Sequence, residues 1–146
     1  MGSDQDKADC FIAERITYRF SQPKRGDLIV FRVNGIERIP IDETRQDVFY
    51  TKRLVGFPGE TIKIRDGHLF VDGRLLDERD GIPPIEYVPR QFDGEIYNVP
   101  KDGFFVLGDN SKNSYDSRYW GSVPQQNVYG RVARIYFPFS RIAAPR

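Results

Sequence analysis

The 146-residue sequence has almost none of the residue types on which the commonest disulfide and metal sites depend. It contains one cysteine, Cys10, and one histidine, His68. A lone cysteine cannot form an internal disulfide, and one histidine cannot build a histidine-based zinc centre. We therefore expect Cys10 to be a core residue, and we expect no metal and no cofactor. His68 follows the turn sequence at 66–67 and is expected to be a solvated bystander.

An excess of charge of either sign and a long apolar run are also lacking. Lysine and arginine total 22, and aspartate and glutamate total 21, so no large basic face is expected and nucleic acid is not an expected partner. Apolar runs such as 28–31 and 104–107 are far shorter than the roughly 20 residues that cross a bilayer as a helix. Residues 1–4 have neither the basic nor the apolar region of a targeting signal.

What the sequence does contain is typical of an all-β protein. Its 13 glycines and 10 prolines separate short apolar stretches rich in Val, Ile, Phe and Tyr. The length predicts a single domain spanning 1–146. Asp-Gly pairs at 66–67 and 72–73 are typical of hairpin turns and predict a meander. We predict strands at 10–14, 28–33, 48–55, 61–65, 68–71, 103–107 and 130–137.

Two stretches are expected to leave regular pairing. Residues 75–100 contain a charged run at 77–80 and then prolines at 83, 84 and 89, which interrupt a sheet, so we expect a surface excursion there. Residues 33–47 carry mixed charges and Pro40, and they are expected to form a second, shorter loop.

The densest group of polar residues lies at 108–121, directly after the apolar run 103–107. One interpretation is a hydrated loop in which Asn, Asp and Ser side chains bond nearby backbone and Asp116 pairs with Arg118. The other is an active-site loop, because hydroxyls and carboxylates at a strand end are typical of groups that orient catalytic residues. The residue types alone leave both interpretations open.

A second candidate group lies at 50–60, with adjacent cations at Lys52 and Arg53. Neighbouring residues of a strand point to opposite faces, so these two side chains cannot share one environment. Burial disfavours a charged lysine and can lower its pKa from about 10.4 by about 3–5 units, into the range of a general base. The alternative is an ordinary solvated lysine on an edge strand.

Both groups resemble motifs of one family. Residues 52–60, KRLVGFPGE, are similar to the lysine box of type I signal peptidases, and residues 108–121 are similar to their C-terminal box. Residues 25–31, RGDLIVF, resemble a third motif. The three motifs occur in the family's order, and the resemblance covers nearly the whole chain. It implies a mostly-β fold with a coiled, partly closed antiparallel sheet and a small inserted cap at 75–100.

The resemblance also implies a serine endopeptidase that removes signal peptides from exported preproteins. Lys52 would be its general base, and Ser114 would orient the lysine amine. Arg53 and Asp109, and likewise Asp116 and Arg118, would be supporting ion pairs. The substrate would bind as an extended strand with small residues before the cut, and the residues expected to line its pockets are Tyr50 and Thr51.

The sequence departs from the family at the nucleophile. The family's serine lies in a Ser-Met-x-Pro box after a membrane anchor, and no such box is present; Ser3 lacks the following Met and Pro. Residues 8–14 resemble the segment shortly after that box. The resemblance therefore implies a membrane-anchored protein with this domain on the extracytoplasmic side of a bacterial plasma membrane or of an organelle membrane. The chain as given, which lacks the serine, is expected to be inactive.

Two other functions fit parts of the pattern. A non-catalytic β-domain of the same fold could bind extended peptides along a sheet edge. A self-cleaving repressor uses the same serine/lysine pair, but proteins of that class lack a box like the one at 113–120.

Overall fold

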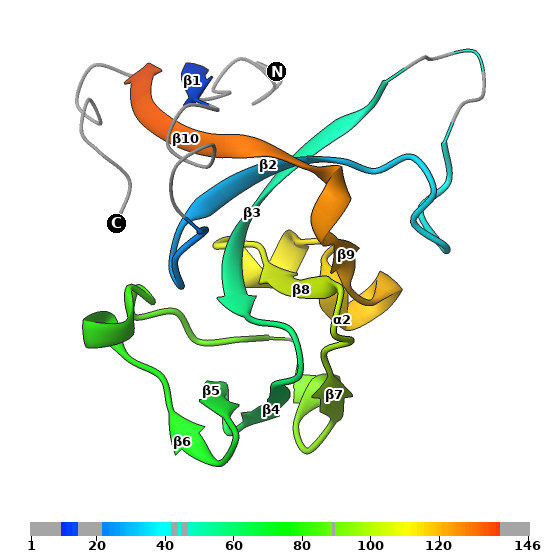
Figure 1. Cartoon of the computed structure of the whole chain (residues 1–146). Coiled ribbons are helices and arrows are strands. Elements are labelled where there is room, and N and C mark those ends of the chain that lie inside the picture. Colours follow the sequence, from blue (N-terminus) through cyan, green and yellow to red (C-terminus); the bar gives the residue numbers. More distant parts are fainter. Residues whose placement is uncertain (1–9, 15–21, 42–43, 45–46, 89, 138–146) are drawn as a thin grey trace, which may run out of the picture.

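A computed structural model of the chain describes residues 10–14, 22–41, 44, 47–88 and 90–137. Within these ranges the protein is mostly β, with two antiparallel sheets and a single α-helical turn, α2 (Ser117–Trp120). Figure 1 shows the larger sheet above the smaller one, with α2 beside the centre of the molecule. The mostly-β fold expected from the sequence is thereby confirmed.

The larger sheet has six strands in the order β1-β10-β2-β3-β8-β9. Its edges, β1 and β9, do not pair, so the strands of the described residues form no closed barrel. Irregular register interrupts the pairing of β1 with β10 at two points. The strands are β1 (Cys10–Glu14), β2 (Leu28–Arg32), β3 (Phe49–Gly56), β8 (Gly103–Leu107), β9 (Val123–Pro124) and β10 (Val128–Phe137).

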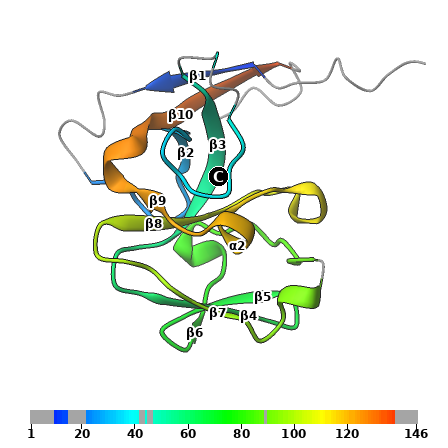
Figure 2. The same cartoon turned by 90° about the vertical axis from the view of Figure 1, so that its right-hand side faces the viewer.

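The smaller sheet has the order β6-β5-β4-β7 and forms a separate layer (Figure 2). Its first three strands make the meander expected from the two Asp-Gly turns. The strands are β4 (Thr61–Arg65), β5 (His68–Val71), β6 (Arg74–Leu75) and β7 (Ile96–Asn98). The connecting 3-10 turns are η2 (Glu78–Asp80), η3 (Arg90–Phe92), η4 (Ser111–Asn113) and η5 (Gln125–Asn127).

Residues 75–100 are irregular for much of their length, as their prolines predict, yet they take part in the fold. They supply β7, which pairs with β4 in the smaller sheet. They also contribute Ile82, Tyr87 and Val99 to the core that packs against the smaller sheet. Apolar residues separated by prolines thus serve as core contacts without forming long strands.

The central strands of the larger sheet are buried on both faces. In β8, Phe104 and Val106 enter one core with the β2 residues Ile29 and Phe31, and Phe105 enters the other core with the residues of the smaller sheet. Burial of each such side chain stabilises the fold by about 1.5–3 kcal/mol. Because both faces of β8 are buried, its sequence is apolar without the alternation of a strand that has one face in water.

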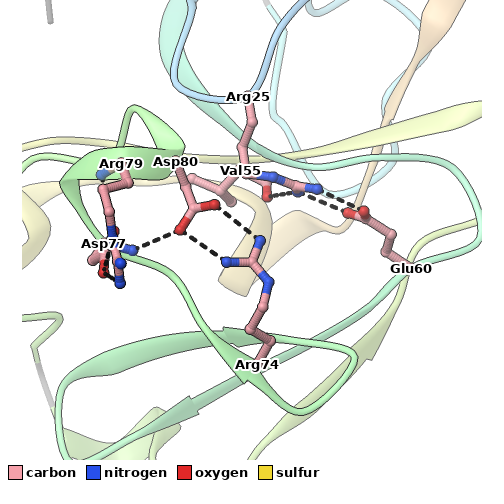
Figure 3. A network of polar contacts seen from close by, with 7 residues as sticks. All are labelled: Arg25, Val55, Glu60, Arg74, Asp77, Arg79 and Asp80. Carbon is pink, nitrogen blue, oxygen red and sulfur yellow. Dashed lines mark hydrogen bonds and ion pairs between the residues drawn. The ribbon is translucent and has the colours of Figure 1, made fainter.

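A close backbone contact joins the two sheets. The turn before β2 carries Gly26 (φ +90) directly against Gly81 (φ +80), which ends η2. A Cβ on Gly26 would lie 2.7 Å from the Gly81 carbonyl carbon. Beside this contact Arg25 donates two hydrogen bonds to Glu60, at 2.8 and 2.7 Å, and a third to the Val55 carbonyl at 2.8 Å (Figure 3).

We expect Gly26→Ala to destabilise the domain more than Gly35→Ala does. Both glycines have positive φ, but a Cβ on Gly35 would meet nothing within 4 Å, so only Gly26→Ala adds a steric clash between the sheets. The difference in unfolding free energy should be about 1–3 kcal/mol, measured by denaturant titration. Equal losses in the two variants would show that the contact at Gly81 does not constrain the fold.

Candidate active site

Lys52 lies on β3 where this strand passes from partly exposed to buried residues. Its Nζ donates a hydrogen bond to Ser114 Oγ at 3.0 Å, although the two residues are 62 positions apart in the sequence. The Tyr50 ring is on the same face of β3, with its centroid 5.9 Å from Nζ. The lysine amine and the serine hydroxyl named from the sequence therefore meet in the fold.

The surroundings of Lys52 favour its neutral form. Burial lowers the pKa of the amine below its ordinary value, because desolvation penalises the ammonium ion. The negative charge of Asp116 acts in the opposite direction, and the positive charge of Arg118 lowers the pKa further. The net direction is downward, toward the range in which a lysine can accept a proton.

The space that Ser114 occupies depends on the absence of a side chain at Gly108. Gly108 follows β8, and a Cβ on it would overlap the Ser114 hydroxyl and lie 2.5 Å from Ser114 Cβ and 3.5 Å from Lys52 Nζ. Glycine at 108 thus leaves the volume that Ser114 occupies. The sequence placed Gly108 in a motif, but its steric role is visible only in three dimensions.

Asp116 connects the two ends of the loop that carries Ser114. Its carboxylate is completely buried and accepts hydrogen bonds from the Gly108 backbone N–H at 3.0 Å and from Arg118 Nε and Nη2, both at 2.9 Å. It also caps α2 by accepting from the Arg118 backbone N–H at 3.2 Å. Ser117 Oγ accepts from the Val106 N–H at 2.9 Å, so side chains of this loop satisfy backbone donors along the edge of β8.

Arg53 and Asp109 connect the two motifs across adjacent strands. Arg53 Nε donates to Asp109 Oδ1 at 2.8 Å, and Nη2 donates to Oδ2, which makes the pair bidentate. Arg53 is 3% exposed, and its Nη1 also donates to the Gly26 carbonyl at 2.6 Å. The pair joins β3 to the residue after Gly108, whereas Asp116 and Arg118 pair within one loop.

Ser111 and Arg118 also bind the backbone of Val88, a contact between the loop at 108–121 and the segment 85–88 that the sequence did not predict. Ser111 Oγ accepts from the Val88 N–H at 2.8 Å and donates to the Val88 carbonyl at 2.9 Å. Arg118 Nη1 donates to the same carbonyl at 3.0 Å, and Nη2 donates to the Ser111 carbonyl at 3.0 Å. The 85–88 segment is thereby fastened to the loop that carries Ser114. Serine and arginine at these positions gave no signal for so distant a backbone partner.

Tyr50 and Thr51 occupy opposite faces of β3, because side chains alternate along a strand. Tyr50 shares the face of Lys52, and Thr51 shares the face of Arg53. Residues 49–52 pair with β2 on one side, whereas pairing with β8 begins only at Arg53. Among the described residues no strand pairs with the other edge of β3 at 49–52. Residues 49–52 therefore form a strand edge beside the lysine in the described part of the sheet.

His68 lies on a different sheet from the cluster around Lys52. His68 is exposed on β5 of the smaller sheet. Within the described ranges no group of three or more His, Cys, Asp or Glu side chains is arranged to hold a metal ion. Cys10 begins β1, whose side chains are not described.

Comparison with known proteins assigns the family. The family model described as "Signal peptidase, peptidase S26" matches residues 1–137. The chain belongs to this signal peptidase family. The computed structure resembles the crystal structure of a signal peptidase I from Enterococcus faecalis, at a TM-score of 0.52 and 31% identity, over 76% of this chain and 97% of that one.

The relatives of this signal peptidase family member carry names consistent with that family. Signal peptidase I of Leptolyngbya laminosa is 40% identical over 92% of this chain, and the thylakoidal processing peptidase 1 of Arabidopsis thaliana is 36% identical over 94%. An inactive signal peptidase IA of Staphylococcus aureus is 30% identical over 97%. The chain spans 63% of the Leptolyngbya protein and 39% of the Arabidopsis protein. In the described residues no helix is long and apolar enough to cross a membrane.

We expect Asp109→Ala to lower the unfolding free energy by about 1–3 kcal/mol, because it removes the bidentate partner of an arginine that is 3% exposed. Asp47→Ala is the matched control: it removes the partner of Arg32 in a pair whose side chains are 52% and 46% exposed. The control should change stability by less than about 0.5 kcal/mol. Denaturant unfolding with an equally small loss for Asp109→Ala would contradict the structural role of the pair.

Proposed function

We propose that this chain is the catalytic domain of a type I signal peptidase in which Lys52 is the general base. The observation that carries the proposal is the half-buried Lys52 amine, 3.0 Å from the Ser114 hydroxyl and with a lowered pKa. A solvated lysine on an edge strand would have neither a fixed hydroxyl partner nor this desolvation. Membership of the signal peptidase family supports the same reading.

In the proposed reaction a serine supplied from the family's Ser-Met-x-Pro box attacks the scissile carbonyl. Neutral Lys52 takes the serine proton as the C–O bond forms, and it returns that proton to the nitrogen of the leaving amine when the C–N bond breaks. Water then attacks the acyl-enzyme and gives its proton to Lys52, which passes it to the serine oxygen as the acyl C–O bond breaks, so that the serine hydroxyl and the neutral amine are restored. Ser114 accepts a hydrogen bond from Nζ and keeps the lysine lone pair directed at the serine.

The proposed substrate is the signal peptide of an exported preprotein, bound as an extended strand. The open edge of β3 at 49–52 supports this, because backbone groups there can pair with a peptide beside Lys52. Tyr50 and Thr51, on the two faces of that edge, would contact side chains near the cut. The ion pairs of Arg53 with Asp109 and of Asp116 with Arg118 would hold the base and its orienting serine in place.

The intact protein is proposed to be anchored in a membrane with this domain on the extracytoplasmic side. Support comes from the family resemblance and from relatives that include a thylakoidal processing peptidase.

One observation favours the non-catalytic alternative, a peptide-binding domain of the same fold. A relative that matches 97% of this chain is named an inactive signal peptidase. The two functions differ in one requirement: catalysis needs Lys52 and a nucleophilic serine, whereas peptide binding along β3 needs neither.

The decisive experiment measures cleavage of a preprotein with small residues before the cut. The chain as printed should not cleave it, because a base without a nucleophile forms no acyl-enzyme. A chain extended upstream by a segment with the Ser-Met-x-Pro box should cleave it. In that longer chain Lys52→Ala should reduce kcat/KM by at least about 1,000-fold, within the range seen when a catalytic residue is removed.

Two matched substitutions serve as controls in the longer chain. Lys63→Ala removes a partly exposed lysine from β4, and His68→Ala removes the one histidine. Both should retain cleavage within about threefold, since neither residue touches the proposed site. Full activity in Lys52→Ala, or its loss in His68→Ala, would refute a lysine-based mechanism.

Activity of the longer chain should rise with pH and then level off. Only the neutral amine accepts a proton, so kcat/KM should follow the deprotonated fraction of Lys52. Because burial lowers the pKa of Lys52, the plateau should begin at a lower pH than an ordinary lysine would allow. A profile that is flat, or that falls as pH rises through the alkaline range, would be inconsistent with a lysine base.

A further inference from the structure

The smaller sheet borders a cavity that the proposed reaction does not use. The cavity has a volume of about 580 Å³, within the roughly 300–1,000 Å³ typical of ligand sites. It is lined by Asp66, by His68 and Leu69 of β5, by residues 75–78 at and after the end of β6, and by the segment 82–87. A neighbouring hollow of about 300 Å³ shares Glu78, Ile82, Pro83 and Pro84 with it.

The floor of this cavity is apolar and uncharged. Leu69, Leu76, Ile82 and Tyr87 line it, and each is between 2% and 6% exposed. Burial raises the pKa of Tyr87 above its ordinary value, so its phenol stays neutral at physiological pH. Leu75, at the rim, is 47% exposed. A ligand that fills the cavity must therefore present an apolar group to it.

Most of the ionisable residues at the rim are acidic. Asp66, Glu78 and Glu86 line the cavity and are exposed, His68 is exposed beside them, and no lysine or arginine is among the described lining residues. Asp77 also lines the cavity, and Arg79 donates to its carboxylate from Nη2 at 2.6 Å (Figure 3). Carboxylates around an apolar floor complement a ligand that carries a positive charge beside an apolar group.

The backbone of Leu75 indicates what kind of ligand can add to this edge. Val71 and Arg74 flank the two-residue turn of the hairpin, and the Leu76 N–H donates to the Leu69 carbonyl at 2.9 Å. Hydrogen-bonded pairs alternate with non-bonded pairs in an antiparallel ladder, so the N–H and carbonyl of Leu75 point away from β5. β6 is the edge strand of the described sheet, and these groups can pair with an extended peptide.

We propose that this cavity and the edge of β6 bind an extended peptide segment that carries a lysine or arginine next to a bulky apolar side chain. The apolar side chain enters the cavity, the cation meets the rim carboxylates, and the peptide backbone pairs with Leu75. The site lies on the smaller sheet, apart from Lys52, and the proposal does not depend on the proposed peptidase function.

The test uses the chain as printed, labelled with ¹⁵N, and the probe acetyl-Ala-Leu-Lys-Leu-Arg-amide. Binding should shift the amide signals of Leu75, Glu78 and Tyr87, and added salt should weaken it. Two control peptides separate the contributions: one replaces both cations by glutamate, and the other replaces both leucines by glycine. Both should bind at least about fivefold more weakly, as loss of about 1 kcal/mol requires.

Substitutions locate the contacts. Glu78→Gln and Glu86→Gln should each raise Kd about two- to fivefold, whereas Glu95→Gln, an exposed carboxylate outside the cavity, should not. Leu75→Pro removes the outward N–H and should weaken binding more than Leu75→Ala; melting temperatures verify that each variant is folded. If Leu75→Pro fails to fold, the glutamate series still decides the question.

Several outcomes would overturn the proposal. These are no signal shifts at millimolar peptide, shifts confined to other surfaces, equal affinity for the glutamate peptide, and Kd values unchanged in both Glu78→Gln and Glu86→Gln. Binding of a small apolar amine with the same affinity as the peptide would assign the cavity to small cations and exclude a peptide site. Concentration-dependent dimerisation that involves the same amides without peptide would assign the surface to a second copy of the chain.

Discussion

The position of the candidate site depends on the buried carboxylate of Asp116. This side chain is completely inaccessible to solvent, and a buried ion is tolerated only when hydrogen bonds replace its hydration. Asp116 obtains those bonds from Arg118 and from the backbone N–H of Gly108. The carboxylate thus fixes the distance between the end of β8 and α2. Ser114 lies between these two anchors and has little freedom to move away from Lys52.

The same ion pair acts on the base electrostatically. Asp116 raises the pKa of Lys52 and Arg118 lowers it, so the two charges partly cancel at the amine, and desolvation remains the largest influence. Without the arginine, the charge of Asp116 would favour the ammonium form with no opposing cation, and the pKa of Lys52 would be lowered less. Arg118 therefore acts in two ways: it pairs with the buried carboxylate of Asp116, and its charge contributes to the lowered pKa of Lys52.

The apolar pattern and the turn residues were sufficient to predict most strands. The contacts that the sequence did not predict join residues that lie far apart along the chain. β4, β5 and β8 have the bounds expected from their apolar residues and Asp-Gly turns. β6 and β9 have two residues each and β7 has three, too few for any periodicity to show. The contact of Lys52 with Ser114 came from family resemblance, because no local rule links residues 62 positions apart. The contact of Gly26 with Gly81 had no signal, since positive φ in a turn explains each glycine separately.

Burial along β3 explains why the reactive amine lies where it does. The first residue of the strand is exposed, the next three, ending at Lys52, are partly exposed, and the last four are buried. The change occurs where pairing with β8 begins, at Arg53, because β8 brings both cores against the strand. One position later a lysine would be enclosed and out of reach of a peptide. Three positions earlier it would be hydrated and protonated. Lys52 stands at the boundary, where partial desolvation and access to an open strand edge are both available.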